Sequence, residues 1–131
     1  MLRILASALA LIALAGSGDA PATAENEKIA AMVTLTDGFT FAPRQVTVHV
    51  GETVEWRNLS PFPHTVTDDP AAAGQKDDAT LPRGAAAFGS GTMQSGETWR
   101  MAFAAPGTYR YFCRLHEGIG MIGEITVLPA R

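Results

Sequence analysis

The stretch Y-F-C-R-L-H-E-G-I-G-M, from Tyr111 to Met121, guides the interpretation of the whole chain. It contains Cys113, the only cysteine among 131 residues, with His116 three positions later and Met121 five positions beyond the histidine. One cysteine cannot form an internal disulfide, so this thiol needs another explanation. It is a buried inert group, a link between chains, a catalytic group or a metal ligand.

Metal chemistry explains the residue types around this thiol. Thiolate and imidazole groups are good ligands for copper and zinc, whereas a thioether is soft and suits Cu(I). Two imidazoles and one thiolate in a trigonal arrangement, with a long axial thioether, form a blue-copper electron-transfer site. Cys113, His116 and Met121 supply three of these groups on one glycine-rich loop. His64, which follows the stiff segment L-S-P-F-P, is the candidate for the second imidazole.

The remainder of the chain has the pattern of short strands separated by turns. Turn dipeptides occur at Asp37-Gly38 and Pro106-Gly107, and no window has a long helical period. The strand-like runs are M-V-T-L-T, F-T-F-A-P, Q-V-T-V-H-V, T-V-E-W-R, H-T-V-T, T-W-R-M-A-F, T-Y-R-Y-F-C and G-E-I-T-V-L. Seven or eight short strands at about 8–12-residue spacing predict an all-β sandwich or small barrel.

Two segments do not fit the strand pattern, and the alternating faces predict a core. Residues 25–31 have the composition of a loose leader, and residues 68–91 that of irregular surface with room for a helical turn. Met32, Met93 and Met101 are interpreted as packing residues, and His49 as a strand histidine directed away from the core. The predicted core comprises Val46, Val48, Val50, Val54, Trp56, Trp99, Met101, Phe103, Ile125 and Val127.

The N-terminus has the features of a secretory signal peptide. Arg3 is followed by an apolar run from Ile4 to Ala15, and Ala22-Thr23-Ala24 fits a cleavage site. The alternative, a membrane anchor, needs roughly 20 apolar residues, and this run is shorter. We therefore expect a signal peptide over residues 1–24, a mature domain over residues 25–131, and export to the periplasm. The net charge of −3 argues against a nucleic-acid partner.

The motifs together resemble the cupredoxin family, most closely the plastocyanin group that includes pseudoazurin and amicyanin. The resemblance is carried by F-A-P-R-Q-V-T-V-H-V-G-E-T-V-E-W-R-N, by F-P-H-T-V and by A-P-G-T-Y-R-Y-F-C-R-L-H-E-G-I-G-M-I-G-E-I-T-V. It covers nearly the whole mature domain. It implies a Greek-key β-sandwich with copper at one end. It assigns His64, Cys113 and His116 as equatorial ligands and Met121 as the axial ligand.

The resemblance also implies a monomer that is not an enzyme and that carries single electrons between redox proteins such as c-type cytochromes or oxidoreductases. In this family the second histidine reaches the surface within an apolar patch. Here that patch would comprise Pro61, Phe62, Pro63, Leu115 and Ile119. The acidic pairs Asp68-Asp69 and Asp77-Asp78 form either a docking patch or a solvated loop. Plastocyanins have tyrosine where Phe112 stands, which puts an acidic docking route in doubt.

Polar groups near the ligands should hold them in place, and three other functions remain open. Main-chain N–H groups should donate to the thiolate, and Asn58 and Thr65 are candidates to tie the two ligand loops together.

A copper-delivery protein without electron transfer is the main alternative, and a zinc site is another. A multi-copper enzyme needs several more histidines, and only His49 remains after His64 and His116 are assigned.

Overall fold

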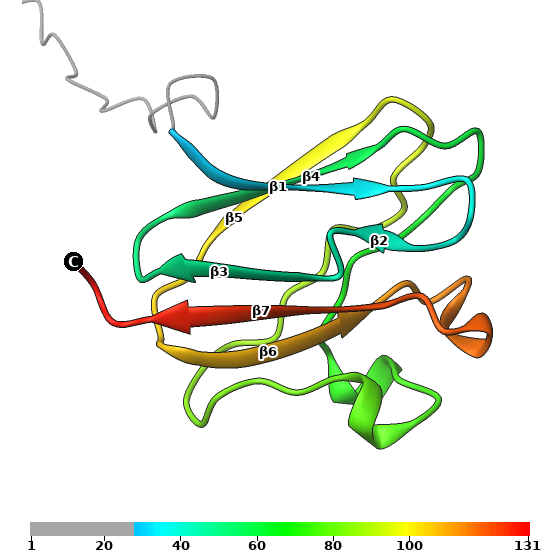
Figure 1. The fold of residues 1–131 in the computed structure, drawn as a ribbon. Helices are drawn as coiled ribbons and strands as arrows, with labels where there is room; N and C mark the ends of the chain where they lie inside the picture. Colours follow the sequence, from blue (N-terminus) through cyan, green and yellow to red (C-terminus); the bar gives the residue numbers. More distant parts are fainter. Residues whose placement is uncertain (1–27) are drawn as a thin grey trace, which may run out of the picture.

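The structure, a computed structural model, describes residues 28–131, and the predicted signal peptide and its cleavage site lie outside the described residues. Its seven strands form two sheets that pack face to face (Figure 1). The four-stranded sheet has the order β2 (Phe41–Ala42), β1 (Ile29–Leu35), β4 (Thr53–Asn58) and β5 (Thr98–Ala102). The three-stranded sheet has the order β3 (Gln45–His49), β7 (Ile122–Leu128) and β6 (Gly107–Phe112).

The connections confirm the predicted Greek-key sandwich. The chain crosses between the sheets from β2 to β3, from β3 to β4 and from β5 to β6. Strand β1 runs parallel to β4, and β3 runs parallel to β7, whereas the other pairs are antiparallel. The C-terminal end of β6 and the N-terminal end of β7 therefore meet at one end of the sandwich, where the Tyr111–Met121 stretch lies (Figure 1).

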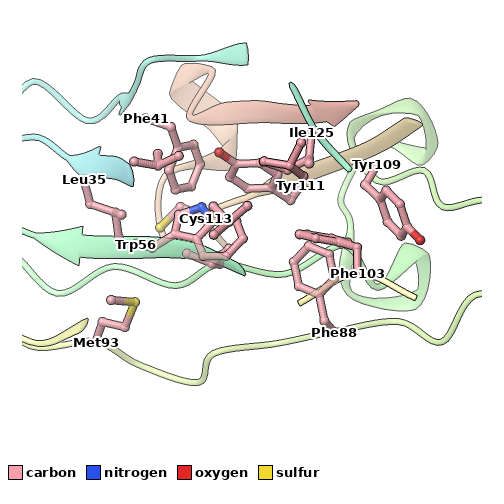
Figure 2. Close-up of a cluster of buried hydrophobic side chains, with 14 of the residues drawn as sticks. Leu35, Phe41, Trp56, Phe88, Met93, Phe103, Tyr109, Tyr111, Cys113 and Ile125 are labelled. Atoms are coloured by element: carbon pink, nitrogen blue, oxygen red, sulfur yellow. The ribbon is translucent and has the colours of Figure 1, made fainter. Parts of the chain in front are cut away.

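The core between the sheets is rich in aromatic rings. Trp56 lies against Tyr111 at 5.6 Å between ring centroids, and Phe88 lies against Phe103 at 5.9 Å (Figure 2). Six predicted core residues are buried: Val48, Val54, Trp56, Phe103, Ile125 and Val127. The other four are only partly buried because β3 and β5 are edge strands: Val46, Val50, Trp99 and Met101.

Several local predictions are wrong. The run H-T-V-T is not a strand, since its main chain pairs with Met93 on one side and with Phe112 on the other, in isolated bridges. Strand β1 begins at Ile29, inside the predicted leader, because it pairs with β4. Met93 is buried as expected for a packing residue, whereas Met32 is 43% exposed.

The loop from residue 68 to residue 91 is irregular, as predicted, but it is more than surface. It contains two short 3-10 helices, η2 (Pro70–Ala72) and η3 (Lys76–Asp78). Phe88 and Ala79 from this loop are buried, and Phe88 packs on Trp56. The loop therefore closes one side of the core.

Candidate metal centre

Three potential metal-binding side chains converge at one end of the sandwich. Sγ of Cys113 lies 3.8 Å from Nδ1 of His64 and 3.4 Å from Nδ1 of His116. The two Nδ1 atoms are 3.2 Å apart. His64 and Cys113 are buried, and His116 is partly exposed. The structure thus brings together three of the four residues that the sequence singled out, from positions 49 and 52 residues apart in the chain.

The ligand loop, residues 113–121, is folded so that Met121 returns to Cys113. The Cys113 N–H donates to the Met121 carbonyl at 3.1 Å, and the His116 N–H donates to the Cys113 carbonyl at 3.2 Å. The Met121 N–H donates to the His116 carbonyl at 3.2 Å. A short 3-10 helix, η4 (Glu117–Ile119), fills the turn, and Gly120 ends it with a φ of 88°. Met121 is fully buried beside the cysteine.

The His64 loop, residues 59–67, is held by the buried side chain of Asn58 at the end of β4. The Asn58 side-chain amide donates to the carbonyls of Phe62 at 2.7 Å and Met93 at 3.0 Å. Its Oδ1 accepts from the main-chain N–H and the hydroxyl of Ser60. The Met93 and His64 main chains also pair reciprocally. The loop is therefore fixed by side chains within the protein.

Thr65 ties the two loops to each other, as predicted. Its main-chain N–H donates to Sγ of Cys113 at 3.3 Å, and its hydroxyl accepts from the Arg114 N–H at 2.8 Å. The prediction for Asn58 is wrong in its partner, since Asn58 ties the His64 loop to Met93 and not to the ligand loop. The reason is that the main chain of Asn58 pairs with residues 96 and 97, which brings its side chain next to Met93.

The geometry and charge of this cluster fit a copper ion. A point at the centre of the triangle formed by the three donor atoms lies about 2 Å from each, close to the metal–imidazole and metal–thiolate bond lengths of about 2.0–2.3 Å. Burial, and then the nearby His116, lowers the pKa of His64, and burial lowers the pKa of His116. Both imidazoles are thus favoured in the neutral form that binds a metal.

Exposed apolar side chains lie on both loops that carry the two histidines. The predicted patch residues Pro61, Phe62, Pro63, Leu115 and Ile119 are all exposed, as expected, with Leu115 at 54% and Ile119 at 67%. Leu59, also at 67%, adds to the exposed apolar side chains at the start of the His64 loop.

The sequence interpretation missed Phe39. Its ring lies 4.5 Å from the His116 ring and 5.1 Å from the Phe62 ring, measured between centroids. Phe39 has a φ of 58°, which is uncommon for a residue with a side chain. The turn around Asp37-Gly38 was recognised, but its left-handed residue could not be placed from the dipeptide. This conformation places the ring beside the histidines, where it also packs against the edge of the core that Phe41 joins.

The predicted acidic surface is smaller than the sequence indicated. Asp68 is fully buried, with one carboxylate oxygen accepting from the Phe88 N–H at 2.7 Å and the other without a hydrogen-bond partner among the described residues. Burial raises the pKa of Asp68 to about 6. Asp77 is exposed, and Asp69 and Asp78 are partly exposed. Asp68 is therefore excluded from any docking patch.

Comparison with known proteins agrees with this geometry. Residues 27–128 match the family described as copper binding proteins, plastocyanin/azurin family. Plastocyanin of Scenedesmus fuscus is 38% identical over 89 residues, which cover 66% of this chain and 85% of that protein. Chloroplastic plastocyanin of Pisum sativum is 32% identical over 96 residues, and the chain spans only 52% of its length.

Solved structures have the same fold. The Cu(I) form of a single-residue mutant of amicyanin aligns with a TM-score of 0.59 and 28% identity, covering 79% of this chain and 87% of that one. A purple cupredoxin from Nitrosopumilus maritimus aligns with a TM-score of 0.59 at 22% identity, covering 74% of this chain and 98% of that one. This second likeness concerns the fold alone.

Within residues 28–131, no helix has the length and apolar character needed to cross a bilayer.

Proposed function

The chain belongs to the plastocyanin/azurin family of copper binding proteins, and we propose that its copper is held by His64, Cys113 and His116 with Met121 as the axial ligand. It is a small blue copper protein of the electron-transfer class. The observation that carries the ligand assignment is the convergence of one sulfur and two ring nitrogens within 3.2–3.8 Å of one another. Bound copper would supply a one-electron couple between Cu(II) and Cu(I).

The residues around the site restrict its rearrangement. Thr65 fixes the thiolate through its N–H and holds the start of the ligand loop through its hydroxyl. Asn58 fixes the loop that carries His64. A ligand set with few degrees of freedom changes little between two oxidation states, so electron transfer needs little reorganisation.

The partner docks on the apolar patch at His116. His116 is the only one of the two histidines that reaches solvent, and Phe39 and Phe62 lie beside it. A small apolar surface suits the brief encounters of redox proteins, which use small interfaces. Phe112 is fully buried and has no hydroxyl, so it offers no surface route of the kind a tyrosine would. We propose a monomeric, non-enzymatic periplasmic carrier whose partners are c-type cytochromes or oxidoreductases.

The visible absorption spectrum tests this proposal most directly. Cu(II) is added to the metal-free protein, and the spectrum is recorded before and after ascorbate. A strong blue band that bleaches on reduction and returns with oxidant is the expected result. Copper binding without that band would remove Cys113 from the ligand set and favour copper delivery, and preferential retention of Zn²⁺ would favour a zinc site.

A further inference from the structure

The tip of the ligand loop is exposed, and its hydrogen bonds are local. The Ile119 N–H donates to the His116 carbonyl at 3.2 Å, and the Gly120 N–H donates to the Glu117 carbonyl at 2.9 Å. Bonds of this kind shape a turn but do not fix its position relative to the rest of the protein. Gly118 and Gly120 are both exposed and add backbone freedom at the tip. The tip of the loop therefore needs an outside anchor.

Glu117, the residue after His116, provides such an anchor on the 68–91 loop. Both of its carboxylate oxygens accept from the Gly74 N–H at 2.9 Å, and Oε1 also accepts from the Gln75 N–H at 3.1 Å. The approach is close, since a Cβ added at Gly74 would lie 3.3 Å from Oε2. We call these contacts the Glu117 clasp.

We propose that Glu117 is a positioning residue, whose clasp on the main chain of Gly74 and Gln75 fixes the tip of the ligand loop and, through it, the orientation of His116. The inference rests on the proposed function, because His116 has to be a copper ligand for its orientation to matter. Hydrogen bonds from N–H groups to a carboxylate are charge-assisted and stronger than neutral ones. Thr65 fixes the start of the loop at Arg114, and the clasp fixes the far side of the histidine.

The clasp also connects the acidic loop to the site. Gly74 and Gln75 lie between η2 and η3, and the exposed side chain of Asp77 lies on η3. A displacement of this loop is thus transmitted to the residue that follows His116, through three hydrogen bonds.

Three substitutions separate position from charge. Glu117→Ala removes the clasp, Glu117→Gln keeps an acceptor oxygen for the Gly74 N–H, and Gly74→Ala places a methyl group against Oε2. Asp77→Asn is the matched control, because it also removes one negative charge, from the 68–91 loop that carries Gly74. In the described part of the chain, Asp77 has no hydrogen bond to the ligand loop. The full chain is used throughout.

Amide hydrogen exchange of the metal-free protein is the first readout. We expect the Gly74 and Gln75 amides, and those of residues 117–120, to exchange about fivefold to tenfold faster in Glu117→Ala. Glu117→Gln should restore part of the protection, Gly74→Ala should lose part of it, and Asp77→Asn should leave it unchanged. Unchanged exchange in Glu117→Ala would overturn the proposal without using copper.

The copper-loaded protein gives the second readout. The visible band of Glu117→Ala should change in position or relative intensity, and its reduction potential should move further than that of Asp77→Asn. Equal potential shifts in these two variants with unchanged spectra would assign Glu117 a charge effect only and overturn the positioning role. If the unsubstituted protein lacked a blue band, the proposed function would fail, whereas the exchange experiment would still report the clasp.

Discussion

The His64 loop and the ligand loop meet at one end of the sandwich but are built in opposite ways. The His64 loop is held by the buried side chains of Asn58 and Ser60, and His64 itself has no exposed surface. The ligand loop exposes Leu115 and Ile119 and is shaped mainly by its own main-chain hydrogen bonds. One loop thus anchors the centre in the protein, and the other presents it to solvent.

The largest expected effect follows from removing the thiolate on the ligand-loop side. In Cys113→Ser the hydroxyl oxygen replaces the soft sulfur, so the strong blue band should disappear entirely and Cu(I) should be held poorly. Visible spectroscopy after Cu(II) addition measures this. His49→Gln is the control, because His49 lies at the end of β3 and contacts Glu52. This substitution should leave the blue band intact. A blue band that survived in Cys113→Ser would rule out the thiolate as its source.

Next in size is the loss of the anchor of the His64 loop. Asn58→Ala removes the donor to Phe62 and Met93 and the acceptor for Ser60, all buried or partly buried. We expect the free energy of unfolding of the metal-free protein to fall by about 3 kcal/mol, measured by urea denaturation. Leu59→Ala, at an exposed neighbour, should change it by less than about 0.5 kcal/mol. Equal losses in both variants would contradict an internally anchored loop.

The end of the His64 loop leads into Asp68, which gives the comparison a pH dependence. The pKa of the Asp68 carboxyl is raised to about 6 in the folded protein, from about 3.9 in the unfolded chain. The protonated carboxyl therefore stabilises the folded state fully at pH values below about 3.9. That contribution is lost as pH rises through 6. Asp68→Asn should therefore raise the stability on the order of 1–3 kcal/mol at pH 8 and by much less at pH 4.

Urea unfolding of both proteins from pH 4 to pH 8 tests this prediction. Asp77→Asn, which removes one negative charge at an exposed site of the 68–91 loop, serves as the control. A stability difference for Asp68→Asn that stayed constant over this range would show that Asp68 does not titrate there.

The smallest expected effect concerns the tie between the loops. Thr65→Val keeps the main-chain N–H that donates to Cys113 but removes the acceptor for the Arg114 N–H. We expect a loss of about 1–2 kcal/mol in unfolding free energy, with the blue band retained. Thr65→Ser keeps the hydroxyl and should recover most of the loss. A loss of the band in Thr65→Val would mean that the hydroxyl, and not the N–H, holds the thiolate.

Periodicity in the sequence predicted most of the strands, and the spacing of the motif predicted that three of the candidate ligands would lie together. The ligand motif and the turn dipeptides are local signals, and His64, Cys113 and His116 do converge. Features that depend on contacts between distant segments were missed. Asp68 belongs to an acidic pair that predicts an exposed site, yet it is buried, and its carboxylate accepts a hydrogen bond from the Phe88 N–H, twenty residues away in the chain.

Two further acidic residues have partners that the sequence did not indicate. In the sequence Glu117 is an ordinary acidic loop residue. Its role becomes visible only in the structure, where the Gly74 N–H donates to its carboxylate. Glu55 lies between the core residues Val54 and Trp56 in β4, so strand alternation places it on the face opposite the core. It is nevertheless buried, because Arg57 and Arg100 cover its carboxylate. Burial acts to raise the pKa of Glu55, but the hydrogen bonds from Arg100 and Arg57 outweigh it and lower the pKa overall. In each case tertiary contacts override what residue type and alternation indicate.

The place of β7 in the three-stranded sheet has a consequence for the order of folding. This strand lies between β3 and β6 and pairs residues 45–49 with residues 124–128. Contacts so distant in sequence are slow to form, because the intervening chain must first be brought together. A nascent chain that still lacks β7 lacks the centre of this sheet, so β3 and β6 have no neighbour within it. The three-stranded sheet, whose β6 leads directly into Cys113, is therefore completed only after the last strand of the chain has been made.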